Sequence, residues 1–151
     1  MMQYPWGKGT PKWTRDAALN DSDKSFTVPA GKIWTAVLSY AQLTASAAVG
    51  NRVLMMAITD GTNELYNSEV TSSIAATQVG QLIVQFGDVQ ANSNVHRLLG
   101  TPATAANVTR TSNAPDMILP AGYVIHVWDT AAIDAAVDDL TVVLHYVEYD
   151  A

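Results

Sequence analysis

Several residue types that support common active sites are missing or scarce in this chain of 151 residues. It has no cysteine, which excludes disulfides, thiolate metal sites and cysteine nucleophiles. Charged residues make up 15% of the sequence, against about 25% in ordinary soluble domains. No lysine follows Lys32, and residues 33–151 carry three arginines against eleven acids. Such an acidic body argues against direct nucleic-acid binding, which requires basic patches.

The chain also lacks long apolar runs and sustained helical periods. No segment approaches the ~20 apolar residues that span a bilayer, so we expect no membrane partner. The start, Met-Met-Gln-Tyr-Pro-Trp-Gly-Lys, has no apolar stretch of the kind found in signal peptides, so we expect no cleaved leader. The length suits one domain with a single hydrophobic core. A surface with so few charges favours a subunit whose faces are covered by neighbours.

A near-repeat marks two equivalent places in the chain. The sequence Val-Pro-Ala-Gly at residues 28–31 returns as Leu-Pro-Ala-Gly at residues 119–122, and each copy leads into a run rich in β-branched and aromatic residues. Proline favours the second position of a type I turn and glycine the fourth, so both copies predict a turn that opens a strand. Two turns that each lead into a strand indicate a two-part antiparallel β architecture.

Alternating apolar residues and turn signals predict a series of strands that begins at Phe26. The main expected strands cover residues 33–44, 52–59, 64–70, 81–86, 123–129 and 140–149. Asp60-Gly61 predicts a hairpin between the second and third of these. The pattern predicts an all-β fold, an antiparallel β-sandwich over residues 26–151, with a jelly roll of about eight strands as its natural closure.

Residues 1–25 have no sustained period, and we expect them to form an extended N-terminal arm. Aromatic residues are rare in solvated tails and frequent as interface anchors, so the arm is predicted to dock on another subunit. Its candidate partner-binding residues are Tyr4, Trp6, Lys8, Lys12, Trp13 and Arg15. The alternative is that these aromatics pack on the chain's own sandwich. With a docking arm, deletion of residues 1–25 should leave a folded core.

A second candidate binding segment is the stretch of residues 90–115, which is dominated by Ala, Asn, Thr and Ser. We expect it to be a long surface loop, and such loops often carry recognition. Its candidate partner-binding residues are Val95, His96, Arg97, Leu98, Leu99 and Arg110.

Patterns that would indicate catalysis are weak. His126 and His145 each stand alone in a strand, and they become a candidate metal pair only if those strands are neighbours; otherwise they satisfy polar positions on a sheet face. Four aspartates, at positions 129, 134, 138 and 139, could hold calcium, but aspartate is also common in turns and the spacing matches no known calcium loop. No nucleophile elbow or phosphate loop is present. We therefore expect no enzymatic activity, no cofactor and no metal.

Four phrases of the sequence resemble small virion proteins of tailed bacteriophages, including head decoration or cement proteins and some tail components. They are Phe-Thr-Val-Pro-Ala-Gly-Lys-Ile-Trp (26–34), Val-Gly-Asn-Arg (49–52), Leu-Pro-Ala-Gly-Tyr-Val-Ile-His-Val-Trp-Asp (119–129) and Asp-Asp-Leu-Thr-Val-Val-Leu (138–144). The likeness covers most of residues 26–149.

This resemblance implies a non-enzymatic structural protein, made in the host cytoplasm and located on the capsid exterior of the virion. It implies that the protein cements neighbouring subunits of the major capsid protein. We expect a homo-oligomer, with a trimer favoured and a dimer as the alternative. Two other readings stay open: a tail, fibre or neck component with a glycan-binding module, and a small β enzyme of the cupin type.

Overall fold

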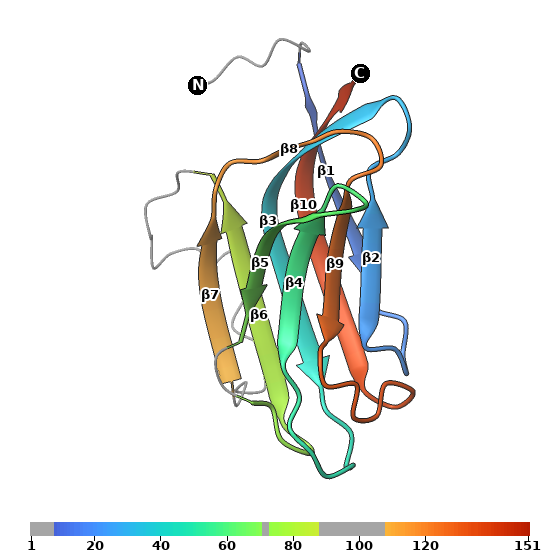
Figure 1. Ribbon diagram of the computed structural model, residues 1–151, viewed down its shortest axis with the longest axis vertical. Coiled ribbons are helices and arrows are strands. Elements are labelled where there is room, and N and C mark those ends of the chain that lie inside the picture. Colours follow the sequence, from blue (N-terminus) through green and yellow to red (C-terminus); the bar gives the residue numbers. More distant parts are fainter. Residues whose placement is uncertain (1–7, 71–72, 88–107) are drawn as a thin grey trace.

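The computed structural model describes residues 8–70, 73–87 and 108–151, and their secondary structure consists of strands and turns (Figure 1). The strands are β1 (Thr10–Asp16), β2 (Asp23–Thr27), β3 (Lys32–Thr44), β4 (Leu54–Thr59), β5 (Glu64–Glu69), β6 (Val79–Phe86), β7 (Val108–Ala114), β8 (Ile118–Leu119), β9 (Val124–Asp129) and β10 (Asp139–Asp150). The predicted all-β fold is confirmed.

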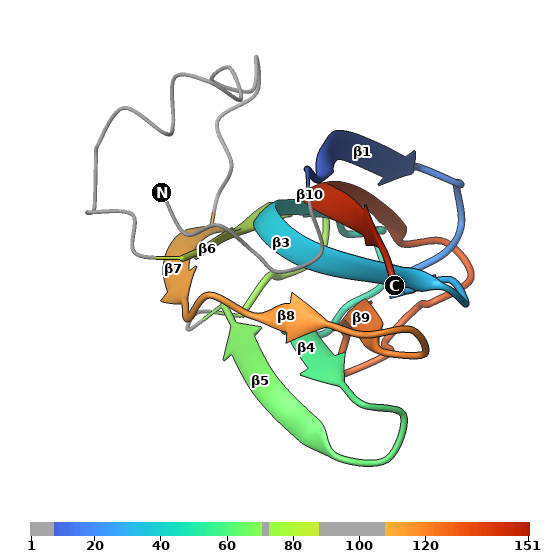
Figure 2. The same cartoon turned by 90° about the horizontal axis from the view of Figure 1, so that it is seen from above.

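The strands form two sheets that face each other across one hydrophobic core (Figure 2). The first has the order β1-β10-β3-β6-β7, with the short β8 also paired to β3, and the second has the order β2-β9-β4-β5. All neighbours are antiparallel except β6 and β7. Alternate residues of β4, β9 and β10 are buried against the facing sheet, as expected of a two-layer sandwich.

The pairing pattern is that of a jelly roll. Strand β4 pairs with β5, β3 with β6, β2 with β9 and β1 with β10. The chain is therefore folded in half at the β4–β5 hairpin, and the resulting long ribbon is rolled so that its pairs alternate between the two sheets. The hairpin turn is the predicted one: Oδ1 of Asp60 accepts hydrogen bonds from the amides of Thr62 and Asn63, at 2.9 and 2.7 Å.

The two Pro-Ala-Gly segments are turns, but of a different type from the predicted one. Each turn closes with a hydrogen bond to the proline carbonyl, from the amide of Lys32 at 3.2 Å and from that of Tyr123 at 3.1 Å. Gly31 and Gly122 have φ angles of +72° and +88°. Proline is thus the first residue of each turn and glycine the third, where a type II turn requires positive φ. The prediction of type I turns is wrong.

The same two segments lie side by side. The amide of Val28 donates to the carbonyl of Tyr123, and the amide of Gly122 donates to the carbonyl of Val28, both at 2.9 Å. The apolar residue before each proline, Val28 or Leu119, is buried in the core. The near-repeat therefore marks the place where both strands of the rolled ribbon cross together from one sheet to the other.

Much of the expected N-terminal arm belongs to the sandwich. Strand β1 pairs with β10 along its whole length, from Thr10 opposite Glu148 to Asp16 opposite Val142. The Nζ atom of Lys24 in β2 is buried 2.9 Å from Asp21 and 3.2 Å from Asp16. The expected domain boundary at residue 26 therefore differs from the structure, in which β1 and β2 are needed to complete the two sheets.

The expected loop of residues 90–115 also contains a strand. Residues 108–114 form β7, which runs parallel to β6 from Val108 opposite Gly80 to Ala114 opposite Phe86. Main-chain hydrogen bonds hold such an edge strand, so its Thr-, Ser- and Asn-rich sequence needs no apolar alternation. The rest of that expected loop, up to residue 107, lies outside the described residues.

Candidate assembly surfaces

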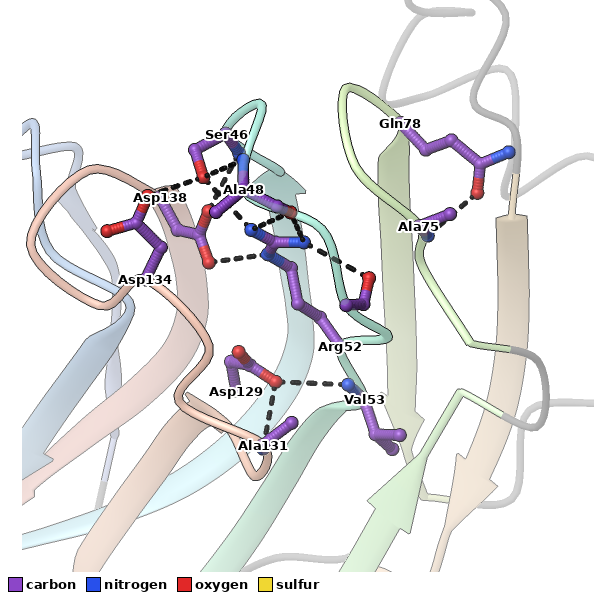
Figure 3. Close-up of polar contacts among 11 residues, drawn as sticks. Ser46, Ala48, Arg52, Val53, Ala75, Gln78, Asp129, Ala131, Asp134 and Asp138 are labelled. Atoms are coloured by element: carbon purple, nitrogen blue, oxygen red, sulfur yellow. Dashed lines mark hydrogen bonds and ion pairs between the residues drawn. The ribbon is translucent and has the colours of Figure 1, made fainter.

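A buried arginine joins two of the loops at the lower end of the sandwich in Figure 1. Three loops at this end are residues 17–22, 45–53 and 130–138, and Figure 3 shows polar contacts of the second and third. Arg52 is fully buried. Its Nε donates to Oδ2 of Asp138 at 2.6 Å, and its Nη2 donates to Oγ of Ser46 at 2.9 Å and to the carbonyl of Ala48 at 3.3 Å. One side chain thus ties residues 45–53 to residues 130–138.

The aspartates of these loops accept hydrogen bonds from other groups of the same protein. Asp138 is also buried and accepts a hydrogen bond from the Ser46 amide at 2.7 Å. Burial raises the pKa of the Asp138 carboxyl, but the hydrogen bonds from Arg52 and Ser46 outweigh it and hold that pKa below its usual range. Ser46 Oγ donates to Asp134 at 2.7 Å, and Asp129 Oδ1 accepts from the Val53 and Ala131 amides.

These contacts give the aspartates the structural role that was the alternative to a calcium site. Within residues 8–70, 73–87 and 108–151, no group of three or more histidine, aspartate or glutamate side chains is placed to hold a metal ion. The carboxylates instead accept hydrogen bonds from the backbone, from Ser46 and from Arg52, and fix the shape of the loops.

The three loops at this end also present apolar side chains to solvent. Leu19, Val49, Ile133 and Val137 are exposed large hydrophobics from the three loops, and Val49 is 94% exposed. A Cβ added at Gly50 would lie 2.9 Å from the Ile133 side chain, so the two loops are in contact there. We call these four side chains the loop-end patch. Exposed apolar side chains gathered at one end of a protein make that end a candidate for protein–protein contact.

A second exposed surface lies along β1. Trp13 is 67% exposed, and it faces outward beside His145 of β10. Two residues on, Arg15 shares this outer face and is also exposed. We call Trp13 and Arg15 the β1 strip. Lys12 points to the other face, where its Nζ lies 2.6 Å from Glu148, so its charge is matched within the protein.

The other sequence-predicted binding residues are placed only in part. Lys8 is exposed just before β1. Arg110 falls on β7, opposite Leu82 of β6, and its side chain lies outside the described set. Tyr4, Trp6, Val95, His96, Arg97, Leu98 and Leu99 also lie outside the described residues.

The two strand histidines are separated. His126 is in β9 and His145 is in β10, which belong to different sheets, so the condition for a histidine pair is not met. His126 instead lies 2.6 Å from Asp23 and stacks on Trp128, with ring centroids 4.1 Å apart. His126 therefore satisfies a polar position on a sheet face, the alternative to a metal pair.

Sequence reasoning missed the Arg52 network and the loop-end patch. One signal was present, because Arg52 is an isolated cation in an acidic body whose aspartates cluster at residues 129–139. Choosing Asp138 among them requires the topology, which brings residues 45–53 against residues 130–138.

No protein-family model and no curated protein matches this chain. Among solved structures, it is similar to Broad Bean Stain Virus (TM-score 0.36, 12% identity, 100% of this chain and 93% of the other) and to Sacbrood virus of honeybee (0.32, 12%, 95% and 86%). A third is a pentameric capsid protein from metagenomic phage sequences (0.30, 12%), for which 91% of this chain spans 61% of the other. At such TM-scores the likeness does not extend to function.

The described residues contain no helix long and apolar enough to cross a membrane.

Proposed function

We propose that this protein is a structural protein of a tailed-phage virion, which binds the outside of the assembled capsid and cements neighbouring major capsid subunits. The loop-end patch carries the proposal. Its apolar side chains stand on loops that buried charged groups hold in place. Arg52 and Asp138 hold the loops of Val49, Ile133 and Val137, and Lys24 donates to the Ala18 carbonyl beside Leu19. Little conformational freedom is therefore lost when a partner covers them.

Charges support the same role. The acids of the loop end are engaged internally: Asp138 by Arg52, Asp134 by Ser46, and Asp21 by Lys24. Apolar side chains next to acids that are already matched within the protein suit a broad, permanent contact. A protein that binds the assembled shell and not its separated subunits stabilises the shell by mass action, without any chemistry.

The β1 strip adds a second contact, which suits a homo-oligomer placed over the joints between capsid subunits. An exposed tryptophan beside an arginine combines two residue types that dominate binding energy at protein interfaces. The resemblance of residues 26–149 to decoration proteins agrees with a trimer over a local threefold position, with a dimer as the alternative.

Cosedimentation with heads of the parent phage assembled without this protein tests the proposal. We expect the wild type to bind and Val49→Asp to lose at least about tenfold in affinity, because a desolvated carboxylate would replace an apolar contact. Ile118→Asp is the matched control, since Ile118 is 44% exposed but lies in β8 at the opposite end. Equal binding by wild type and Val49→Asp would remove the loop-end patch from the interface.

The number of copies of this protein in each particle distinguishes a head protein from a tail protein. A number per purified particle comparable with that of the major capsid protein supports head decoration. A number that fills only one ring would place the protein in the neck or tail and contradict the proposal.

A further inference from the structure

The outer face of the β2-β9-β4-β5 sheet carries an unusual row of side chains. Asp23, Trp128, Met55 and Glu69 are consecutive register partners across the four strands. They face outward, because the residues that alternate with them, such as Val127 and Met56, are buried in the core. The row therefore places a tryptophan and a methionine between two carboxylates.

This face is acidic. Its outward side chains include Asp23, Glu64 and Glu69, and the outward positions of its four strands hold no lysine or arginine. Asp23 is engaged by His126, and Glu64 accepts a hydrogen bond from Asn67. Glu69 is exposed and has no ion-pair partner among the described residues. The face thus offers one unmatched carboxylate beside an aromatic surface.

The complementary charge occurs on the same chain. Four cations of the described residues are matched by internal acids: Lys12, Lys24, Lys32 and Arg52. Arg15 is exposed on the β1 strip and has no such partner within the described part of the chain. The outward side chains of β1 and of residues 141–147 in β10 include no carboxylate. A basic aromatic surface and an acidic aromatic surface therefore lie on different sheets of one molecule.

We infer that the β1 strip of one copy docks on the acidic row of a second copy, with Arg15 on Glu69 and Trp13 against Met55 and Trp128. The spacing fits. Trp13 and Arg15 are two residues apart on one strand, and are therefore about 7 Å apart. Neighbouring strands of a sheet are about 5 Å apart, so that Met55 lies about 5 Å from Glu69 and Trp128 about 10 Å from it. The indole would then lie between Met55 and Trp128, where a thioether and an aromatic ring provide favourable contacts.

A second copy is favoured over another occupant because the chain itself supplies both halves of the contact. The two surfaces differ, so the interface is heterologous and builds a ring when the rotation between copies closes. This inference deepens the proposed function and rests on it, since it names the sister copy as the partner of the β1 strip and leaves the loop-end patch for the capsid.

Sedimentation equilibrium of the purified full chain tests the inference. We expect the wild type to exceed its monomer mass of 16.2 kDa and to dissociate as salt is added. Arg15→Glu and Glu69→Lys should each weaken self-association by at least about tenfold, and the double variant should recover most of that loss. Glu64→Lys makes the same charge change outside the row, and should not rescue Arg15→Glu. Trp13→Ala should also dissociate the oligomer.

A wild type that stays monomeric up to millimolar concentration overturns the inference, as does a double variant no better than its weaker parent. Thermal unfolding of each variant checks that the fold is retained. Cosedimentation with heads, measured in parallel, keeps the two proposals apart: capsid binding by a monomer refutes the self-contact alone, whereas an oligomer that does not bind heads refutes the proposed function alone.

Discussion

Replacing Arg52 with methionine tests how much the buried network contributes to stability. Methionine keeps a long side chain but removes the charge, leaving Asp138 buried without its 2.6 Å partner and Ser46 Oγ without the donor at 2.9 Å. Removing one member of a buried ion pair typically costs about 3–5 kcal/mol. Because domains are stable by only about 5–15 kcal/mol, much of the free energy of unfolding would be lost. For this chain length, the midpoint of thermal unfolding should fall by roughly 6–20 °C.

Urea unfolding followed by tryptophan fluorescence measures the loss. Lys8→Met is the matched control, because Lys8 is exposed before β1 and its replacement should change the free energy of unfolding by no more than about 0.5 kcal/mol. Adding Asp138→Leu to Arg52→Met should recover part of the loss, since no charge then stays buried alone. A loss below about 1 kcal/mol for Arg52→Met would refute a stabilising role for the network.

Three further outcomes follow from local geometry. Gly122→Ala should cost about 1–2 kcal/mol by chemical denaturation, because φ is +88° although nothing lies within 4 Å of an added Cβ; a smaller loss for Gly122→Asn would show that backbone strain is the cause. Gly80→Ala should cost about 1–3 kcal/mol, because its Cβ would lie 2.1 Å from the buried Ile74 side chain; an unchanged denaturation midpoint would contradict that packing. Hydrogen bonds from Lys12 and from Trp34 hold the pKa of Glu148 below its usual range, so its stabilisation is present above the unfolded pKa of about 4.3 and is lost as pH falls through the folded value. Glu148→Gln should therefore flatten the acid side of a plot of stability against pH, and an unaltered plot would contradict this.

Strands with strong apolar patterns were predictable because their burial follows from their own residues. Residues 33–44, 81–86 and 140–149 were expected as strands, and β3, β6 and β10 cover them with shifts of one or two residues at their ends. The jelly roll was also predicted, since many short strands separated by turns close most readily in that way. The two Pro-Ala-Gly turns were placed correctly in the chain, but their type depended on φ at glycine, which the residue order alone leaves open.

The candidate surfaces could not be predicted from the sequence alone, because they depend on contacts between residues far apart in the chain. Trp13 and Arg15 were expected in a binding segment, but their outward direction follows from the register of β1 against β10. Lys12 directly precedes Trp13 in the sequence and points the other way, to Glu148, which is 136 residues distant. Side chains alternate along a strand, so Lys12, which is matched by Glu148, and Arg15, which is not matched within the described residues, lie on opposite faces of β1. This arrangement could be predicted only after residues 10–16 were recognised as a strand.

The N-terminal boundary could not be predicted because β1 is an edge strand. Its outward residues Trp13 and Arg15 are exposed, and its inward Asp16 is matched by Lys24 from β2. Such a strand shows no apolar alternation, although it is in register with β10 along its whole length. Deleting residues 1–25 would remove β1 and Lys24 and expose one edge of β10, so that fragment should not keep a folded core. Deleting residues 1–9 leaves every described strand in place, and it therefore separates the contribution of the N-terminal segment to binding from its contribution to folding.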